Sequence, residues 1–195
     1  MLTFTLRILN QIIQGTLNPP KISIKNKAIN IPFRCWPIDL DAFLHMNNAN
    51  YLKNAELARW RTFPIKSLIS NFTSKEGMVF LAVENKVQYL KPIGPFERYN
   101  ISTSCYVNDK DDKWIYYRHV FEQHPLDVAV VPEKTMSFSK GSSSDDRSEN
   151  INTPIKFAVV DVKAVVKQRN GMTIKPSILI GKSDFYRKFI TARLP

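Results

Sequence analysis

The sequence predicts an α+β domain in which one long helix packs against an antiparallel sheet of about five strands. Two patterns predict this class. A helix-like segment rich in alanine spans residues 49–63, and after Gly77 apolar residues begin to alternate with polar ones, as they do in strands. Short turns separate the alternating segments, and strands joined by short turns pair antiparallel. The chain has 195 residues, of which 44% are hydrophobic, and this is enough for one packed domain.

The first predicted element is an amphipathic helix at residues 1–17. Its apolar face consists of Leu2, Leu6, Leu9, Ile12, Ile13 and Leu17. Asn18-Pro19-Pro20 ends the helix, because proline cannot continue it. No Asp or Glu precedes Asp39, so residues 1–30 resemble a targeting segment and a mitochondrial location is expected. The alternatives are a secretory signal, an anchor lying in the surface of the endoplasmic reticulum or another membrane, and a plain docking helix.

The next elements, residues 31–140, are predicted to form the domain. A short strand at residues 31–37 leads into a polar turn at residues 39–48. The helix at residues 49–63 follows, capped by Asn47 or Asn48 and ended by Pro64. The predicted strands that come after it are one between Gly77 and Tyr89, then residues 99–108, 114–123 and 128–139, with a hairpin turn at residues 109–112.

The C-terminal part is predicted to lie outside this domain. Residues 141–153 are rich in Ser, Asp and Asn and are expected to form a flexible linker. Residues 154–195 are expected to form a basic extension, with mixed periodicity at residues 155–166 and a helix at residues 183–192. Basic and aromatic residues are interleaved near its end, an arrangement that can bind RNA, although the spacing matches no RNA-binding motif.

Composition narrows the classes of partner and cofactor. The formal net charge of +11 favours an anionic partner, such as a phosphate-bearing ligand, a nucleic acid or a membrane surface. No apolar run of about 18 residues occurs, which excludes a membrane-spanning helix. Cys35 and Cys105 lie far apart, so we expect buried thiols, with a single disulfide as the alternative, and no metal site. No glycine-rich phosphate loop occurs, and no cofactor is expected.

The turn before the central helix carries the most information about function. Residues 39–52 read DLDAFLHMNNANYL and hold two carboxylates, one imidazole and three carboxamides. A helix start offers unpaired backbone N–H groups that can hold an oxyanion, here those of Asn48 and Ala49. Asp41 in front of them can act as a nucleophile or as a general base on water, with His45 orienting it or the substrate. This chemistry suits attack on the acyl carbon of a thioester.

At these residues the chain resembles the hotdog-fold thioesterase superfamily. The Asp-x-Asp, the following His-x-Asn-Asn, Tyr51 and the helix residues Glu56-Leu57-Ala58-Arg59 match its pattern. Within the superfamily the chain looks most like the eukaryotic thioesterase superfamily member six family, which shares a later Pro-Phe-Glu like Pro95-Phe96-Glu97. The resemblance covers about residues 30–140 and implies a sheet wrapped around the central helix.

The resemblance also implies a substrate and a set of contacts. Asp41 matches the catalytic carboxylate of bacterial acyl-CoA thioesterases, and His45 with Asn47 and Asn48 matches acyl-carrier-protein thioesterases. Two positions depart from these patterns, because Phe43 replaces an Asn of the second group and Asn48 replaces a His of the first. The substrate would be an acyl-CoA or an acyl-carrier thioester, with coenzyme A entering only as part of it. The expected substrate-binding residues are Asn47, Tyr51, Lys86, Lys91 and Arg98.

Three functions stay open at the level of the sequence. The first is hydrolysis of a fatty acyl thioester by a homodimer that pairs through an open edge of its sheet. The second is a catalytically inactive hotdog protein that serves as an accessory subunit of a larger, mitochondrial complex, since Phe43 and Asn48 depart from the patterns of active enzymes. The third is an RNA-associated basic protein, which the net charge favours and the absence of an RNA-binding motif disfavours.

Overall fold

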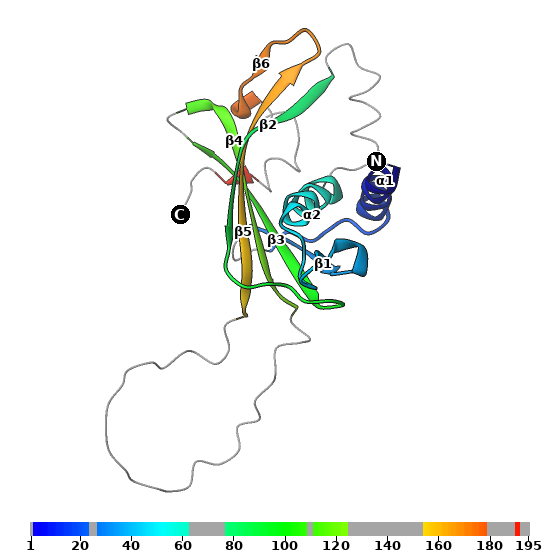
Figure 1. Cartoon of the computed structure of the whole chain (residues 1–195). Coiled ribbons are helices and arrows are strands. Elements are labelled where there is room, and N and C mark those ends of the chain that lie inside the picture. The colour runs from blue at the N-terminus through cyan, green and yellow to red at the C-terminus, as the bar shows by residue number, and fades with distance from the viewer. Residues whose placement is uncertain are drawn as a thin grey trace, which may run out of the picture.

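A computed structural model describes residues 2–23, 27–62, 77–108, 111–124, 154–178 and 190–191 (Figure 1). In this part of the chain, one curled sheet carries two α-helices on the same side. The predicted α+β class is therefore confirmed. The predicted strand at residues 128–139 and the linker at residues 141–153 lie outside the described residues.

Five long strands make up the sheet. They are β1 (Ile29–Arg34), β2 (Met78–Tyr89), β3 (Arg98–Asn108), β4 (Asp111–Gln123) and β5 (Lys156–Gln168). Their order is β1-β3-β4-β5-β2, and every neighbouring pair in this order is antiparallel. Two short strands complete it, because β6 (Thr173–Ile174) pairs with β5 and β7 (Ile190–Thr191) pairs with β3. Among the described strands β2 is the last of the path, so one of its sides has no paired strand in this part of the chain.

Strand β5 changes the expected organisation of the C-terminal part. It lies in the region that the sequence assigned to an extension, yet it pairs with β4 on one side and with β2 on the other. Its mixed periodicity has a physical cause, since consecutive residues such as Val165 and Val166 are both buried, at 6% and 1% exposed. The helix expected at residues 183–192 is wrong at its end, where Ile190–Thr191 form β7. Residues 179–189 lie outside the described part of the chain.

Helix α2 (Asn48–Arg61) covers the sheet and contacts β3 and β5. The cap predicted at Asn47 is confirmed, because its side-chain oxygen accepts the backbone N–H of Ala49 at 2.9 Å. Ala55 and Ala58 are fully buried, and their small side chains let the helix approach the strands closely. The helix ends at Arg61, two residues before the predicted end. Between α2 and the end of β1 lies the short 3-10 helix η1 (Pro37–Asp39).

Helix α1 (Leu2–Leu17) forms a second helical layer on α2, away from the strands (Figure 1). A Cβ atom at Gly15 would lie 2.3 Å from the carbonyl oxygen of Arg61, so only glycine permits this approach. The packed face differs from the predicted apolar face. Of that face's described side chains only Ile12 is buried, whereas Leu6, Leu9, Ile13 and Leu17 are exposed. No helix in the described part of the chain is long and apolar enough to cross a membrane.

Candidate active site at the start of helix α2

Asp39 is the carboxylate that the structure buries in the turn before α2, and its side chain is 1% exposed. Its Oδ2 accepts the backbone N–H of Trp36 at 3.1 Å, and its Oδ1 lies 2.9 Å from Nη1 of Arg7 on α1. Its carbonyl oxygen accepts the N–H of Asn47 and the side-chain amide of Asn50, both at 2.8 Å. Asp39 therefore ties the turn to both helices. Its buried position makes it a structural residue, which the sequence did not predict.

Asp41 lies at the surface of the same turn and is partly exposed. Its Oδ1 accepts the backbone N–H groups of Phe43 at 2.9 Å and His45 at 3.2 Å. Its own N–H donates to the carbonyl of His45 at 2.8 Å, and Leu44 closes the loop with a positive φ of 59°. No residue described by the structure donates a hydrogen bond to the second carboxylate oxygen, Oδ2, which is therefore open to water. The contact from His45 to Asp41 runs through the backbone, whereas the prediction gave that role to the imidazole.

The two N–H groups expected to form an oxyanion hole differ in their surroundings. The N–H of Ala49 donates to the side chain of Asn47 at 2.9 Å, so the cap occupies it. Asn47 thus acts as the helix cap through its side-chain oxygen. The N–H of Asn48 makes no hydrogen bond within the described residues. It is the helix-start donor that this arrangement leaves for a developing oxyanion.

Tyr51 lies in the core beneath the turn and is 2% exposed. Its ring packs against those of Tyr89 and Phe121, with both centroid distances at 5.2 Å. Burial raises the pKa of Tyr51 to about 12, so the phenol stays protonated at neutral pH. Tyr89 reaches the helix start as well, because its hydroxyl donates to the carbonyl of Asn48 at 3.3 Å. Tyr51 of α2 thus packs on Tyr89 of β2 and Phe121 of β4, and together with the Tyr89 hydroxyl these contacts hold the start of α2 on the sheet.

The cations predicted to contact the substrate do not gather at one place. Lys86, on β2, lines a depression of about 270 Å³ together with Arg118 and Asp161. Arg118 and Asp161 pair there, with 2.8 Å between Nε and Oδ1, and the pairing raises the pKa of the Arg118 guanidinium. No residue of the turn at 39–48 lines this depression. The depression that Lys86 lines is thus not formed by the turn that holds Asp41.

Lys91 and Arg98 are better placed, since they flank the connection between β2 and β3. The side chain of Lys91 is exposed, and its N–H anchors to the carbonyl of Phe157 at 3.0 Å. Within this connection, the carbonyl of Ile93 accepts the N–H of Met46 at 2.9 Å. The connection is thereby joined directly to the turn that holds Asp41. Two of the three predicted cations therefore flank a segment bonded to the candidate turn.

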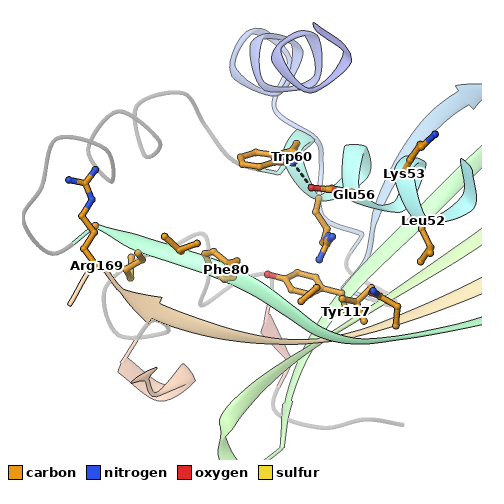
Figure 2. A pocket seen from close by; sticks show the side chains of 14 residues that line it. Leu52, Lys53, Glu56, Trp60, Phe80, Tyr117 and Arg169 are labelled. Atoms are coloured by element: carbon orange, nitrogen blue, oxygen red, sulfur yellow. Dashed lines mark hydrogen bonds between the residues drawn. The ribbon is translucent and has the colours of Figure 1, made fainter. Parts of the chain in front are cut away.

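A pocket of about 480 Å³ opens between α2 and β2 (Figure 2). Figure 2 shows Glu56 and Trp60 on the helix above Phe80 of β2 and Tyr117 of β4. Trp60 Nε1 donates to Glu56 Oε1 at 3.4 Å. The guanidinium of Arg59 lies 5.7 Å from the centre of the Tyr117 ring, a cation–π contact. The pocket therefore combines aromatic and apolar walls with charged groups, as small-molecule sites do.

His119 lies behind this pocket and is fully buried. Its ring stacks on Tyr117, with centroids 6.2 Å apart, and its Nδ1 lies 2.9 Å from the hydroxyl oxygen of Thr103. Its Nε2 has no hydrogen-bond partner among the described residues. Burial, and then the positive charge of Arg59, hold the pKa of His119 well below its ordinary value. The imidazole is therefore neutral at physiological pH.

Two parts of the site could not be recognised in the sequence. Arg7 belongs to a helix that the sequence assigned to a separate segment, although it is the only charged residue of residues 1–17. A single charge in an otherwise uncharged helix is the signal that could have indicated a buried partner. The pocket draws residues from α2, β2, β4 and β5, and no local pattern joins these segments. No group of three or more His, Cys, Asp or Glu residues that could hold a metal occurs in the described ranges.

Known proteins share this fold. The model of the thioesterase-like superfamily matches residues 35–169, which includes β5. The probable thioesterase YbaW from Escherichia coli superposes with a TM-score of 0.55 at 14% identity, over 83% of this chain and 98% of that one. A thioesterase-superfamily structure from Jannaschia sp. CCS1 gives a TM-score of 0.55 at 14% identity, over 88% and 89% of the two chains.

A third solved structure is the dynemicin thioesterase, studied for polyene binding. It is 9% identical and has a TM-score of 0.56, over 85% of this chain and 99% of that one. A comparison with curated proteins finds no match. At such low identities the similarity to solved structures shows the hotdog fold alone. It does not identify the substrate or the roles of individual residues.

Proposed function

Because the chain belongs to the thioesterase-like superfamily and has its hotdog fold, we propose that it hydrolyses a fatty acyl thioester, with acyl-CoA or an acyl-carrier thioester as the substrate class. The observation that supports this most is the turn at the start of α2. It holds the partly exposed carboxylate of Asp41, and it ends at the N–H of Asn48, which has no partner among the described residues; the same helix lines a pocket with apolar walls. The proposal includes two further points. The chain is related to the eukaryotic thioesterase superfamily member six family, and its sheet wraps around α2.

In the proposed reaction Asp41 acts as the general base on a water molecule. The N–H groups of Phe43 and His45 hold one carboxylate oxygen, and the other faces the water. As the water oxygen bonds to the acyl carbon, its proton passes to Asp41, and the negative charge on the carbonyl oxygen is held by the N–H of Asn48. The carbon–sulfur bond then breaks, and the proton leaves with the thiol. Direct attack by Asp41 is the nucleophilic variant of the same step.

The substrate's two ends would occupy different parts of the molecule. We assign the acyl chain to the pocket between α2 and β2, where Trp60, Phe80 and Tyr117 provide apolar contacts. Lys91 and Arg98 would contact the phosphates of coenzyme A, since they flank the connection that is bonded to the turn. Lys86 would contribute less, because it lines the separate depression beside Asp161.

The test is thiol release from acyl-CoA esters of several chain lengths by the purified full-length protein. Asp41→Asn keeps an acceptor for the two backbone N–H groups but removes the base, so activity should fall by roughly 100-fold or more. Asp112→Asn is the matched control, because Asp112 is another carboxylate that accepts a backbone N–H, that of Ser177 at 3.1 Å. It should retain full activity.

Two outcomes would refute the catalytic assignment. One is equal activity of the wild type and Asp41→Asn on every ester, and the other is an equal loss in both aspartate variants. The protein's own cysteines should not react with the reagent that detects the released thiol. Cys35 and Cys105 are buried free thiols, as predicted, and burial raises the pKa of Cys35 to about 11.

A second candidate is a catalytically inactive hotdog subunit of a larger assembly. Two observations favour it over the RNA-associated alternative. The cap occupies the N–H of Ala49, and Phe43 and Leu44 project from the turn with 81% and 64% of their surfaces exposed. Such residues suit contact with a partner protein. A wild-type protein that releases no thiol and migrates from native extracts with a larger complex would select this candidate.

We also propose a mitochondrial location in which α1 is retained after import. Arg7 and Gly15 fix α1 to the folded domain, so its removal would leave Asp39 buried without its cation. N-terminal sequencing of the protein isolated from mitochondria tests this. A mature chain that begins after residue 17, or its absence from mitochondria, would contradict the proposal.

A further inference from the structure

Helix α1 presents an apolar stripe that faces away from the protein. Leu6, Leu9, Ile13 and Leu17 are 56%, 48%, 41% and 69% exposed. Their spacing of three and four residues places them along one side of the helix. The packed side is the opposite one and carries Arg7, Ile12 and Gly15. The sequence predicted this apolar face, and the structure leaves it without a partner in the described part of the chain.

The contacts of the packed side fix the orientation of the stripe. Nη1 of Arg7 lies 2.9 Å from Asp39, and its Nη2 donates to the side chain of Asn54 at 3.0 Å. Gly15 leaves no space between α1 and the carbonyl of Arg61. Turning the helix to bury its leucines would break this ion pair and separate the two helices. The contacts of Arg7 and Gly15 therefore keep the stripe turned away from α2 in the described part of the chain.

A second exposed apolar group lies close to the attachment point of α1. Ile38 is 73% exposed and directly precedes Asp39, the partner of Arg7. Trp36 is 51% exposed and packs edge-on against Phe96, itself 54% exposed, at a centroid distance of 6.4 Å. Tryptophan is typical of the boundary between water and lipid, because its ring is apolar while its N–H prefers a polar partner.

The charge of this region indicates what covers the stripe. Residues 1–38 contain five basic residues and no Asp or Glu. Lys21, Lys27 and Arg34 are exposed, and the guanidinium of Arg34 lies 5.7 Å from the centre of the Trp36 ring. An exposed apolar helix face, in a segment that has exposed cations and no acidic residue, complements an anionic lipid surface.

We propose that α1 binds in the plane of an anionic bilayer, with Leu6, Leu9 and Ile13 among the acyl chains. Lys21, Lys27 and Arg34 contact the lipid phosphates, and α2 with its sheet stays on the aqueous side. The site at the start of α2 then stands close to the membrane, because Asp39 joins it to α1. This inference is independent of the proposed hydrolysis, since it rests on the exposed side of α1 and on the charge of residues 1–38, and uses neither Asp41 nor the N–H of Asn48.

The test measures co-flotation of the full-length protein with phosphatidylcholine vesicles that contain or lack phosphatidylserine. The wild type should bind the anionic vesicles and bind the neutral ones less. Leu9→Glu with Ile13→Glu should weaken binding by roughly tenfold or more, without lowering the melting temperature, because both side chains are exposed. The matched control is Met172→Glu with Ile178→Glu, two other apolar side chains that are 62% and 47% exposed. It should bind like the wild type.

Three results would overturn the proposal. The first is a wild type that floats with neither kind of vesicle. The second is an equal loss of binding in the control pair, which would show that added negative charge alone is responsible. The third is an assembly that the wild type forms without lipid and that the Leu9→Glu, Ile13→Glu protein does not form. This would show that a protein surface, and not a membrane, covers the stripe. Thiol release from acyl-CoA is measured on the same proteins. Its result bears on the proposed hydrolysis and leaves the membrane proposal unaffected.

Discussion

Asp39 and Asp41 are separated by one residue, yet their carboxylates lie in opposite environments. Asp39 is buried and paired with Arg7, whereas Asp41 is partly exposed and accepts backbone N–H groups of its own turn. A buried carboxylate with its full set of partners serves the fold. A carboxylate at the surface, with one oxygen open to water, is placed for proton transfer. The catalytic proposal therefore depends on Asp41, and Asp39 holds the turn in position.

The pairing of Arg7 with Asp39 predicts a loss of stability when one partner is removed. Arg7→Met leaves a buried carboxylate without its cation, which should lower the free energy of unfolding by about 2 to 3 kcal/mol. Urea unfolding at neutral pH measures this loss. Lys21→Met, which removes an exposed cation, is the control and should change stability by less than about 0.5 kcal/mol. Equal effects of the two substitutions would show that Asp39 does not depend on Arg7.

His119 should make stability depend on pH. Burial holds its pKa in the folded protein well below the ordinary value, which the imidazole regains in the unfolded chain. As the pH falls below about 6.5, the unfolded chain binds a proton that the folded protein excludes. Its contribution to stability is therefore complete above that pH and is lost as the pH decreases, by up to about 1.4 kcal/mol per pH unit.

His119→Gln tests this dependence, because glutamine keeps a polar partner for Thr103 and does not titrate. Its free energy of unfolding should change less than that of the wild type between about pH 7.5 and about pH 5.5. Both proteins contain the same carboxylates. Subtracting the pH dependence of one protein's free energy of unfolding from that of the other therefore removes the carboxylate contribution. Identical slopes would mean that His119 takes up its proton while folded.

The residues that sequence reasoning placed correctly act locally. Asn47 caps α2 as predicted, because a cap depends on residues within three positions of it. The burial of Asp39 could not be predicted, since its cation lies on a helix 32 positions away in sequence. The occupied N–H of Ala49 was missed for another reason. The sequence indicated both a cap and an oxyanion site, and one N–H group cannot serve both.

At the scale of elements, α1 shows the limit of periodicity. The pattern of leucines and isoleucines correctly predicted the helix over residues 2–17. It did not predict which side faces the protein, because that side is chosen by Arg7 and Gly15, one charged and one without a side chain. Strand β5 was assigned to an extension for a related reason. Burial on both of its faces removes the alternation that identifies a strand with one face in solvent.

Gly15→Ala tests whether the close packing of α1 on α2 is needed. In an exposed helix this substitution stabilises by about 1 kcal/mol, but here the added Cβ meets the carbonyl of Arg61. We expect a net destabilisation of about 1 to 3 kcal/mol in urea unfolding. Asn10→Ala, on the exposed side of α1, should be neutral or slightly stabilising. A stabilised Gly15→Ala protein would show that α1 is not packed on α2.

At the scale of the whole molecule, β2 is the strand that the described part of the chain leaves unpaired on one side. Val79, Leu81 and Val83 are 48%, 46% and 55% exposed along this strand. An apolar edge of this kind tends to pair with another strand. We propose that a second copy pairs there, so that the protein is a homodimer as the sequence suggested.

The oligomeric state tests the role of this edge. Sedimentation equilibrium should give twice the mass of the chain for the wild type. Leu81→Lys should shift the equilibrium towards the monomer, since a charged side chain opposes edge pairing. Leu90→Lys, an equally exposed leucine just beyond β2, should stay dimeric. A monomeric wild type, or dissociation by both substitutions, would argue against pairing through β2.

The most direct test of the central claim is a crystal structure with an acyl-CoA analogue in which a methylene group replaces the thioester sulfur. The account predicts that its carbonyl oxygen lies within hydrogen-bond distance of the Asn48 N–H, with Asp41 facing the carbonyl carbon. The acyl chain should then lie between Trp60 and Phe80. An analogue bound with its carbonyl away from residues 41–48, or with its chain outside the pocket between α2 and β2, would contradict the account.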